Sequence, residues 1–171
     1  DWVGAHPAPT PLRAAVVGCG LGDDAEFLAS ASYDVTAFDI SPTAIAMCGD
    51  RWPDSAVRYC VGDLFDPEPD WAAGFDLVYE CNTIQALRGS RRHEAFGALT
   101  RLLAPGGHLL VSCRSRDVGV PPGDQVPIPL DRAEITRFVE LGLEEIHFEA
   151  YDDDQDPPVP HFFGVYRSSR G

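Results

Sequence analysis

The stretch AAVVGCGLGDDAEFLA, from Ala14 to Ala29, decides the fold. An apolar run is followed directly by Gly18, Gly20 and Gly22, and a helical pattern begins after them. Glycine allows a tight turn and lets a ligand approach the backbone closely. The stretch therefore predicts a strand, a ligand-binding turn and a helix, which is how a nucleotide-binding unit begins.

Apolar runs alternate with helical patterns through most of the remaining chain. Strands are expected at Ala14–Val17, Val35–Phe38, Val57–Val61, Phe75–Tyr79 and His108–Cys113. Helices are expected to begin at Ser41-Pro42, at Ser90 and at the capping box Asp131-x-x-Glu134, and the last of them to end at Gly142. Its apolar face is expected to carry Ile135, Phe138 and Val139. This alternation predicts a mostly parallel sheet with helices on both faces.

The C-terminal part has a different pattern. EEIHFEA alternates polar and apolar residues, HFFGVYR forms a second strand-like run, and the acidic, proline-rich YDDDQDPPVP joins them. Two half-buried strands joined by a loop predict an antiparallel pair at one edge of the sheet. No linker divides the chain, so one domain is expected over residues 1–171. The chain begins at Asp1 without Met, which leaves the completeness of its N-terminal segment open.

Composition narrows the classes of partner. The 13 basic and 27 acidic residues give a net charge of −14, which repels nucleic acid and anionic membranes. No apolar run reaches the roughly 18 residues of a membrane span, and no signal peptide is recognisable. The scattered histidines predict no metal site. The cysteines are odd in number and form no CxxC pair, which predicts reduced thiols in a cytoplasmic protein; they are Cys19, Cys48, Cys60, Cys81 and Cys113.

Two aspartates follow the glycine turn, where the helix begins. A dinucleotide-binding turn, G-x-G-x-x-G/A, needs Gly or Ala at position 23, which here is Asp23. The pyrophosphate of a dinucleotide lies over this helix N-terminus, where the carboxylates of Asp23 and Asp24 would repel it. S-adenosylmethionine (SAM) carries no phosphate, and its sulfonium and α-amino groups are cationic. The turn therefore favours SAM, even if the aspartates only cap the helix.

Two further aspartates lie at the carboxyl ends of predicted strands. Asp39 ends the second strand, 21 positions after Gly18, where a carboxylate can accept both hydroxyls of a ribose. Asp63 ends the third strand, where a carboxylate can accept the amino hydrogens of adenine. Leu64 and Phe65 follow it and offer an apolar wall for the ring. Together these residues predict a site for an adenosine group.

In combination these motifs resemble the class I SAM-dependent methyltransferases, and the resemblance covers nearly the whole chain. The segments that carry it are VVGCGLG, VTAFDIS, VGDLF, FDLVYECNTIQAL and LLAPGGHLLVS, the last with a turn at Pro105-Gly106-Gly107. The family implies one Rossmann-like α/β domain with a seven-stranded, mostly parallel sheet, strand order 3-2-1-4-5-7-6 and strand 7 antiparallel. The C-terminal motifs also show a weak similarity to the small-molecule branch that contains thiopurine and tellurite methyltransferases.

The resemblance implies a role for each matching position. The residues expected at the cofactor are Gly18, Cys19, Gly20, Gly22, Asp23, Asp39, Ile40, Asp63, Leu64, Phe65, Glu80 and Cys81. The glycines would face the methionine part and the ribose, and the backbone around Glu80 and Cys81 would approach the amino-acid end. Many family members have an acidic residue two places before the first glycine, where this chain has Val16. We expect Asp23 to recognise the α-amino group instead.

The acceptor is expected beyond the carboxyl ends of the fourth and fifth strands. Glu80, Asn82 and Arg114 are the candidates to bind it. Glu80 is also the best-placed general base, unless it only orients the substrate or binds backbone, so no catalytic residue is assigned. Asn82 does not form the N-P-P-Y pattern of methyltransferases that act on amide-like nitrogens. Cys81 is expected to be packed, since direct transfer needs no nucleophile, and Ser115–Leu130 is either a lid or a surface connection.

The sequence thus predicts an enzyme that transfers a methyl group from SAM to a small-molecule nucleophile and releases S-adenosylhomocysteine (SAH). The acceptor could be a thiol or other chalcogen, a phenol or an amine. Two rivals are a non-catalytic SAM-binding protein and an NAD-dependent oxidoreductase, which Asp23 disfavours. The identity of the acceptor and the oligomeric state are left open by these residues.

Overall fold

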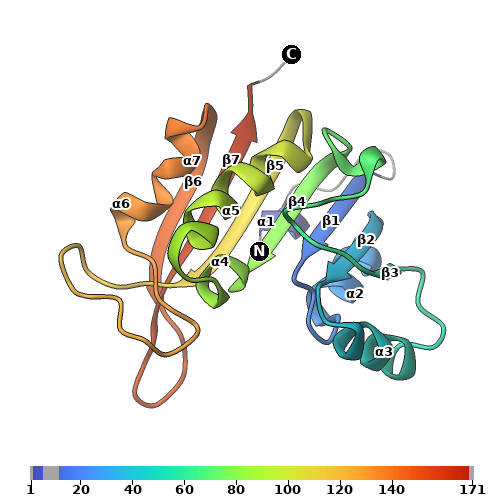
Figure 1. Ribbon diagram of the computed structural model, residues 1–171, viewed down its shortest axis with the longest axis horizontal. Helices are drawn as coiled ribbons and strands as arrows, with labels where there is room; N and C mark the ends of the chain where they lie inside the picture. Colours follow the sequence, from blue (N-terminus) through green and yellow to red (C-terminus); the bar gives the residue numbers. More distant parts are fainter. Residues whose placement is uncertain (1, 6–11, 170–171) are drawn as a thin grey trace.

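The computed structural model describes residues 2–5 and 12–169. Its centre is a seven-stranded sheet of order β3-β2-β1-β4-β5-β7-β6 (Figure 1). The strands are β1 (Arg13–Val17), β2 (Asp34–Asp39), β3 (Arg58–Val61), β4 (Phe75–Cys81), β5 (Leu103–Arg114), β6 (Leu143–Asp152) and β7 (Pro160–Ser168). β1 to β5 pair in parallel, whereas β7 runs antiparallel to β5 and β6. The predicted strand order and antiparallel edge pair are confirmed.

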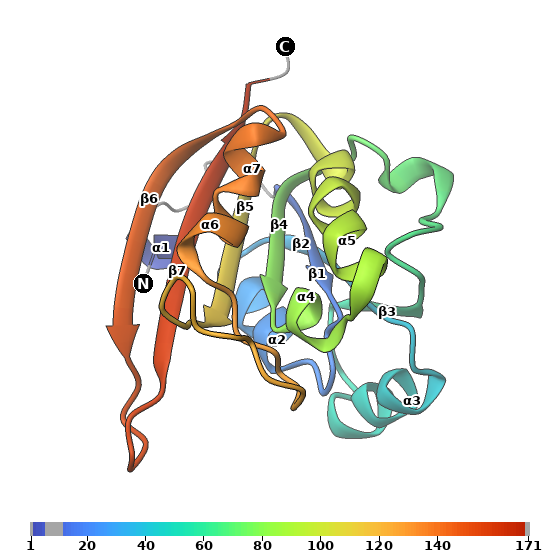
Figure 2. The same cartoon turned by 60° about the vertical axis from the view of Figure 1, so that its left-hand side comes forward.

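Helices cover both faces of this sheet. They are α1 (Trp2–Ala5), α2 (Asp23–Ser30), α3 (Pro42–Arg51), α4 (Thr83–Ala86), α5 (Gly89–Leu102), α6 (Arg132–Ile135) and α7 (Arg137–Glu140), with a 3-10 turn at Pro69–Trp71. Figure 2 shows α5, α6 and α7 in front of the sheet and α1 and α2 behind it. Within the described ranges, no helix is both long and apolar enough to cross a membrane.

The core is divided by the sheet into two clusters. One contains Phe96 and Leu99 of α5 and Phe138 of α7, and the other contains Val3 of α1 and Leu28 of α2. β1 lies between β2 and β4, and all its residues after the first are buried. A parallel strand that is covered on both faces has a continuous apolar sequence. This is why β1 could be predicted from the apolar run before the glycine turn.

The Pro105-Gly106-Gly107 turn lies inside β5 rather than before it. Phe75 pairs with Leu103 and Leu77 with His108, so the turn bulges out of the ladder between two paired segments. Gly106 has a φ of +75°, a left-handed conformation that favours glycine. The bulge sets the register of the remaining part of β5, which pairs with β4 up to its carboxyl end.

Two helix starts follow their predicted chemistry. The Ser41 hydroxyl accepts the N–H of Ala44 at the start of α3, and Asp131 and Glu134 form the expected capping box at α6. The helix after Asp131 is divided into α6 and α7 at Thr136, which the sequence did not predict. Its apolar face was also partly wrong, since Val139 is 42% exposed.

Candidate cofactor site

A cavity of about 340 Å³ opens at the carboxyl ends of the parallel strands, and we call it the strand-end cavity. Its walls come from the ends of β1, β2 and β4, the loop after β3, and α4. The lining residues are Val17, Gly18, Phe38, Asp39, Ile40, Gly62, Asp63, Leu64, Phe65, Cys81, Asn82, Thr83, Ala86 and Leu87. The structure therefore brings together most of the residues expected at the cofactor, and Asn82 lies with them.

Asp39 is held at the rim of this cavity by two backbone hydrogen bonds. Its Oδ2 accepts the N–H of Gly20 at 3.1 Å, and its Oδ1 accepts the N–H of Ser41 at 2.9 Å. Each carboxylate oxygen has a second lone pair, so both can still accept a hydrogen bond from a ligand. Asp39 thus presents a fixed pair of acceptors, and it also ties the glycine turn to the start of α3.

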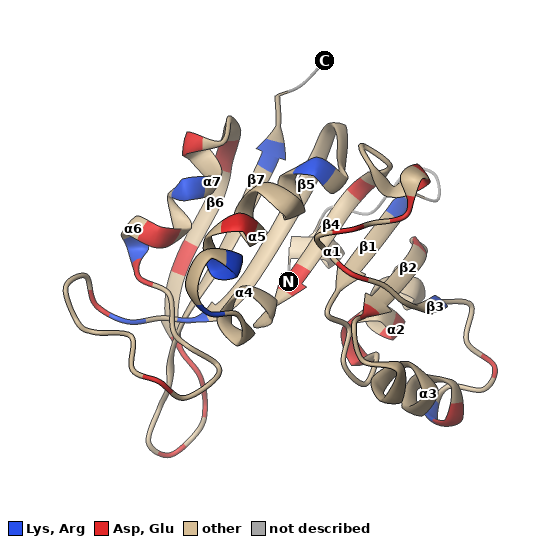
Figure 3. Ribbon diagram, in the orientation of Figure 1, with Lys and Arg blue, Asp and Glu red and all other residues tan. Residues whose placement is uncertain are grey.

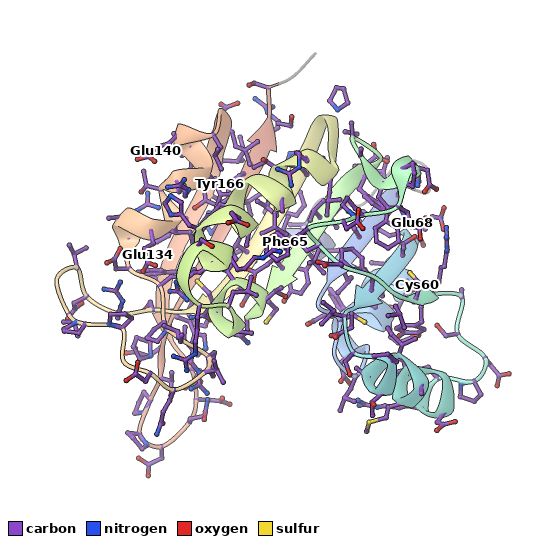
Figure 4. The ribbon with its side chains drawn as sticks, in the orientation of Figure 1. Cys60, Phe65, Glu68, Glu134, Glu140 and Tyr166 are labelled. Carbon is purple, nitrogen blue, oxygen red and sulfur yellow. The ribbon has the colours of Figure 1, made fainter. Side chains whose placement is uncertain are left out.

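The Asp63 loop, which follows β3, forms another part of the cavity wall. Asp63 Oδ1 accepts the N–H of Phe65 at 2.8 Å, which fixes the turn and leaves Oδ2 for a ligand. Phe65, labelled in Figure 4, lies beside α5, and the guanidinium of Arg91 is 4.4 Å from the centroid of its ring. Ile40 is 70% exposed although it lines the cavity. A bound apolar ring would cover this side chain and remove its surface from water.

α4 and the residue that follows it supply a wall that was not predicted from the sequence, made of Thr83, Ala86 and Leu87. Asn82 precedes it with a φ of +62°, which turns the chain sharply out of β4. Thr83 Oγ1 then donates to the carbonyl of Val17 at 2.8 Å and fixes α4 against the end of β1. The available signal was the FDLVYECNTIQAL motif, but a four-residue helix has too few positions to show which face it presents.

Glu80 is completely buried, and its side chain contacts the backbone of α4. Oε1 accepts the N–H of Ile84 at 2.9 Å, whereas Oε2 has no hydrogen-bond partner in the described part of the chain. Glu80 does not line the strand-end cavity. This position fits the alternative that Glu80 binds backbone, because the carboxylate accepts from the N–H of Ile84 at the start of α4.

This burial leads to a prediction about pH. Desolvation raises the pKa of Glu80 from 4.5 to about 7, against smaller opposing contributions from the N–H groups of Ile84 and Thr83. A raised pKa means that the folded state holds the proton more tightly than the unfolded state. The stabilisation that this proton binding at Glu80 gives the folded state is complete below pH 4.5 and is lost as the pH rises through about 7. Between pH 5 and pH 8 this loss is roughly 2 to 3 kcal/mol of unfolding free energy.

Urea unfolding of the wild-type chain and of Glu80→Gln at both pH values measures this loss. We expect it to be absent from Glu80→Gln, and to persist in Glu140→Gln, whose side chain is exposed on α7 (Figure 4). Equal pH dependence in wild type and Glu80→Gln would contradict the assignment.

Asp23 does not lie where its predicted role requires. Its two oxygens accept hydrogen bonds from the Arg51 guanidinium, at 2.6 and 2.8 Å, and it does not line the strand-end cavity. Arg51 pairs with this carboxylate outside the strand-end cavity, so the geometry lends no support to the prediction that Asp23 recognises the α-amino group. Because Arg51 compensates the charge of Asp23, repulsion of a pyrophosphate at this turn comes mainly from Asp24.

We therefore expect Asp23→Ala to change the affinity for SAH by less than about twofold. The ion pair with Arg51 is solvent-exposed, and pairs of this kind contribute no more than about 1 kcal/mol to stability. Isothermal titration with SAH checks the affinity, and thermal unfolding checks the stability. A tenfold loss of SAH affinity in a folded variant would restore the original assignment.

Three further residues predicted to bind cofactor or acceptor do not line the strand-end cavity. Cys19 and Gly22 do not line the cavity, and a Cβ at Gly22 would lie 2.4 Å from the Tyr59 hydroxyl, so Gly22 serves helix packing. Arg114 is also outside it; its backbone N–H and carbonyl bind the side chain of Gln85. None of Ser115–Leu130 lines the cavity, so this segment does not cover it.

Comparisons with known proteins identify the family of the chain. A family described as a methyltransferase domain matches residues 15–107, more than half of the 171-residue chain. Thiocyanate methyltransferase 1 from Arabidopsis thaliana is 28% identical over 149 residues, which cover 85% of this chain and 62% of the relative. The chain thus spans less than two thirds of the length of this curated relative.

Solved structures show the same fold. A SAM-dependent methyltransferase from Methanosarcina mazei has a TM-score of 0.81 at 13% identity, covering 99% of this chain and 98% of its own. An N-methyltransferase from Bradyrhizobium japonicum, solved with SAH, has a TM-score of 0.73 at 20% identity, covering 93% of this chain and 79% of its own.

The sheet order and the cavity at its carboxyl edge define a class I, Rossmann-like methyltransferase fold. The sequence match makes the assignment specific: the chain belongs to the methyltransferase domain family, and the methyl donor of this class is SAM.

Proposed function

We propose that this chain binds SAM with its adenosine group in the strand-end cavity and transfers the methyl group to a small-molecule nucleophile. The observation that carries this proposal is the placement of Asp39 and Asp63 at the ends of neighbouring strands, in the wall of one cavity that apolar side chains also line. No Lys or Arg is among the described residues that line the cavity. Such a lining suits an uncharged nucleoside and offers nothing to neutralise a pyrophosphate.

Each wall of the cavity has a part in this arrangement. The two oxygens of Asp39 accept the ribose hydroxyls, and the free Oδ2 of Asp63 accepts the adenine amino group. The apolar side chains of Ile40, Phe65 and Leu87 pack against the adenine ring. Gly18, with a φ of +63°, lets the donor approach the backbone at the end of β1.

Methyl transfer from SAM depends more on the alignment of donor and acceptor than on a strong acid or base. SAM supplies an already activated methyl carbon, so the chain has to orient the acceptor and exclude water. Cys81 lines the cavity, but burial raises the pKa of its thiol to about 11, which keeps it protonated and inert near neutral pH. Together with the buried Glu80, this leaves the strand-end cavity as a donor-positioning site.

Isothermal titration with SAH, SAM and NAD tests donor binding. Labelled-methyl transfer to thiocyanate, a thiol, a phenol and an amine then tests activity, thiocyanate being included because a relative is named for it. We expect SAH and SAM to bind and NAD not to bind. Binding of NAD without SAH would reject the proposal, and tight SAH binding without transfer to any acceptor class would favour a non-catalytic SAM-binding protein.

A further inference from the structure

A second cavity, of about 400 Å³, lies on the α1 and α2 face of the sheet, and we call it the aromatic cavity. Its lining residues are Trp2, Val3, Asp24, Phe27, Leu28, Tyr79, Leu110, Glu149, Tyr151 and Phe163. Half of them are aromatic, two are carboxylates, and none of these described residues is basic. A cavity of this size fits a small organic molecule. Phe27 is 50% exposed and Tyr151 is 39% exposed, so a ligand would cover apolar surface that water now contacts.

Tyr79 lines the aromatic cavity, and its side chain is in contact with a residue of the strand-end cavity. The side chains of Tyr79 and Cys81 interact on the same face of β4, and Cys81 lines the strand-end cavity. The Tyr79 hydroxyl also interacts with the carboxylate of Asp24. Asp24, Tyr79 and Cys81 therefore form a series of polar side chains in contact, which begins in the aromatic cavity and ends at the carboxyl end of β4, where the strand-end cavity lies.

The charge inside the aromatic cavity is negative. Asp23 is paired with Arg51, but Asp24 has no ion pair in the portion of the chain that the structure describes. Glu149 lies 3.7 Å from the His147 Nε2, a partner that is cationic only when protonated. Burial and the neighbouring Asp23 raise the pKa of Asp24, whereas the contact with Tyr79 lowers it. Acidic residues occur on most elements of the molecule, which carries −14 in total (Figure 3), so the net charge of the chain adds to the negative charge of these carboxylates.

We propose that the aromatic cavity binds the methyl acceptor, and that this acceptor is an amine with an apolar or aromatic body, held as a cation. The inference rests on the proposed function and narrows its acceptor to one class. Aromatic faces attract an ammonium group, and a carboxylate pairs with it directly. An anionic acceptor such as thiocyanate or a thiolate would instead meet Asp24 and Glu149. The chain would thus differ in substrate class from the relative named for thiocyanate.

The transfer step balances with groups that are present. The bound ammonium first gives one proton to the Asp24 carboxylate, which frees the nitrogen lone pair. The nitrogen then forms a bond to the methyl carbon while the carbon–sulfur bond breaks, and its electron pair stays on sulfur. The products are SAH and the methylated ammonium, and the proton leaves Asp24 to solvent.

Isothermal titration with matched probes tests the cavity without relying on turnover. The probes are 2-phenylethylamine, the neutral 2-phenylethanol and the anionic 3-phenylpropionate, each added to the chain in the presence of SAH. We expect the amine to bind at least about tenfold more tightly than the carboxylate, a difference of about 1.4 kcal/mol. Equal affinity, or tighter binding of 3-phenylpropionate, would overturn the inference.

Two neighbouring variants locate the effect. Asp24→Asn keeps the size of the side chain and removes its charge, so we expect it to weaken 2-phenylethylamine about tenfold and to leave 2-phenylethanol unchanged. Asp23→Asn removes the same charge one residue away, where the side chain pairs with Arg51, and should leave both probes within about twofold. Equal losses in the two variants would show general electrostatics in place of a site, and would reject the inference.

SAH binding separates this inference from the proposed function. If the chain does not bind SAH, the proposed function fails whatever the amines do. If SAH binds and the three probes are not distinguished, only the amine assignment fails.

Discussion

Replacing Asp39 by Ala is expected to weaken the binding of SAH by about 100-fold. A hydrogen bond to a charged group contributes about 1.5 to 3 kcal/mol, and 1.4 kcal/mol corresponds to a factor of ten. The variant loses the acceptors proposed for both ribose hydroxyls. It also releases the N–H groups of Gly20 and Ser41, which Asp39 now holds at 3.1 and 2.9 Å. Isothermal titration with SAH measures the change.

Asp34 provides a matched control on the same strand. It begins β2 at the opposite end from the cavity and is exposed, so Asp34→Ala should leave SAH affinity within about twofold. Equal affinity of Asp39→Ala and wild type, with both proteins folded by circular dichroism, would remove Asp39 from the ribose site.

Gly18→Ala is the second substitution with a large expected effect. Gly18 has a φ of +63°, and a Cβ there would lie 2.4 Å from Thr83 Oγ1. A left-handed non-glycine residue costs about 1 to 2 kcal/mol, and crowding costs about 1 to 3 kcal/mol more. Thr83 would have to give up its hydrogen bond to Val17, and the wall formed by α4 would move. We expect about 3 kcal/mol of lost stability and no measurable SAH binding at micromolar concentrations.

Two further variants separate backbone strain from the steric clash. Gly119 has a φ of +86° and open space around its Cβ position, so Gly119→Ala adds strain without touching the cavity and should bind SAH normally. In the double variant Gly18→Ala/Thr83→Ala, the nearest remaining Thr83 atom is Cβ at 3.4 Å. That variant should regain part of the lost stability. If it does not, the clash with Thr83 is not the cause.

The parts of the fold and site that depend on strand ends could be predicted from the sequence. Asp39 and Asp63 follow apolar runs, and parallel strands bring their carboxyl ends to one edge, so their meeting at one cavity required no knowledge of side-chain packing. The antiparallel pair β6 and β7 was predictable for a similar reason, because alternation over several residues defines a half-exposed strand.

The parts that depend on side-chain direction could not be predicted. Asp23 and Asp24 are neighbours on one helix turn, yet the first faces Arg51 and the second faces Tyr79. Sequence alone does not show which of two adjacent helix positions faces the sheet when the helix has only eight residues. The direction of Glu80 was open for a related reason: successive strand residues point to opposite faces, and of Glu80 and Cys81 only Cys81 lines the strand-end cavity.

The outer edge of β6 has a consequence for how the protein behaves at high concentration. An unpaired edge strand can recruit the same strand of another molecule, and charged side chains oppose such contacts. β6 carries Glu144, Glu145, His147, Glu149 and Asp152 along its length. Glu144 pairs with Arg167 and Glu145 with Arg132, so the carboxylates of Glu149 and Asp152 are the ones that repel a second copy. Replacing Glu149 and Asp152 by uncharged residues would remove this repulsion, so β6 is the strand where self-association into larger aggregates would then be expected to begin.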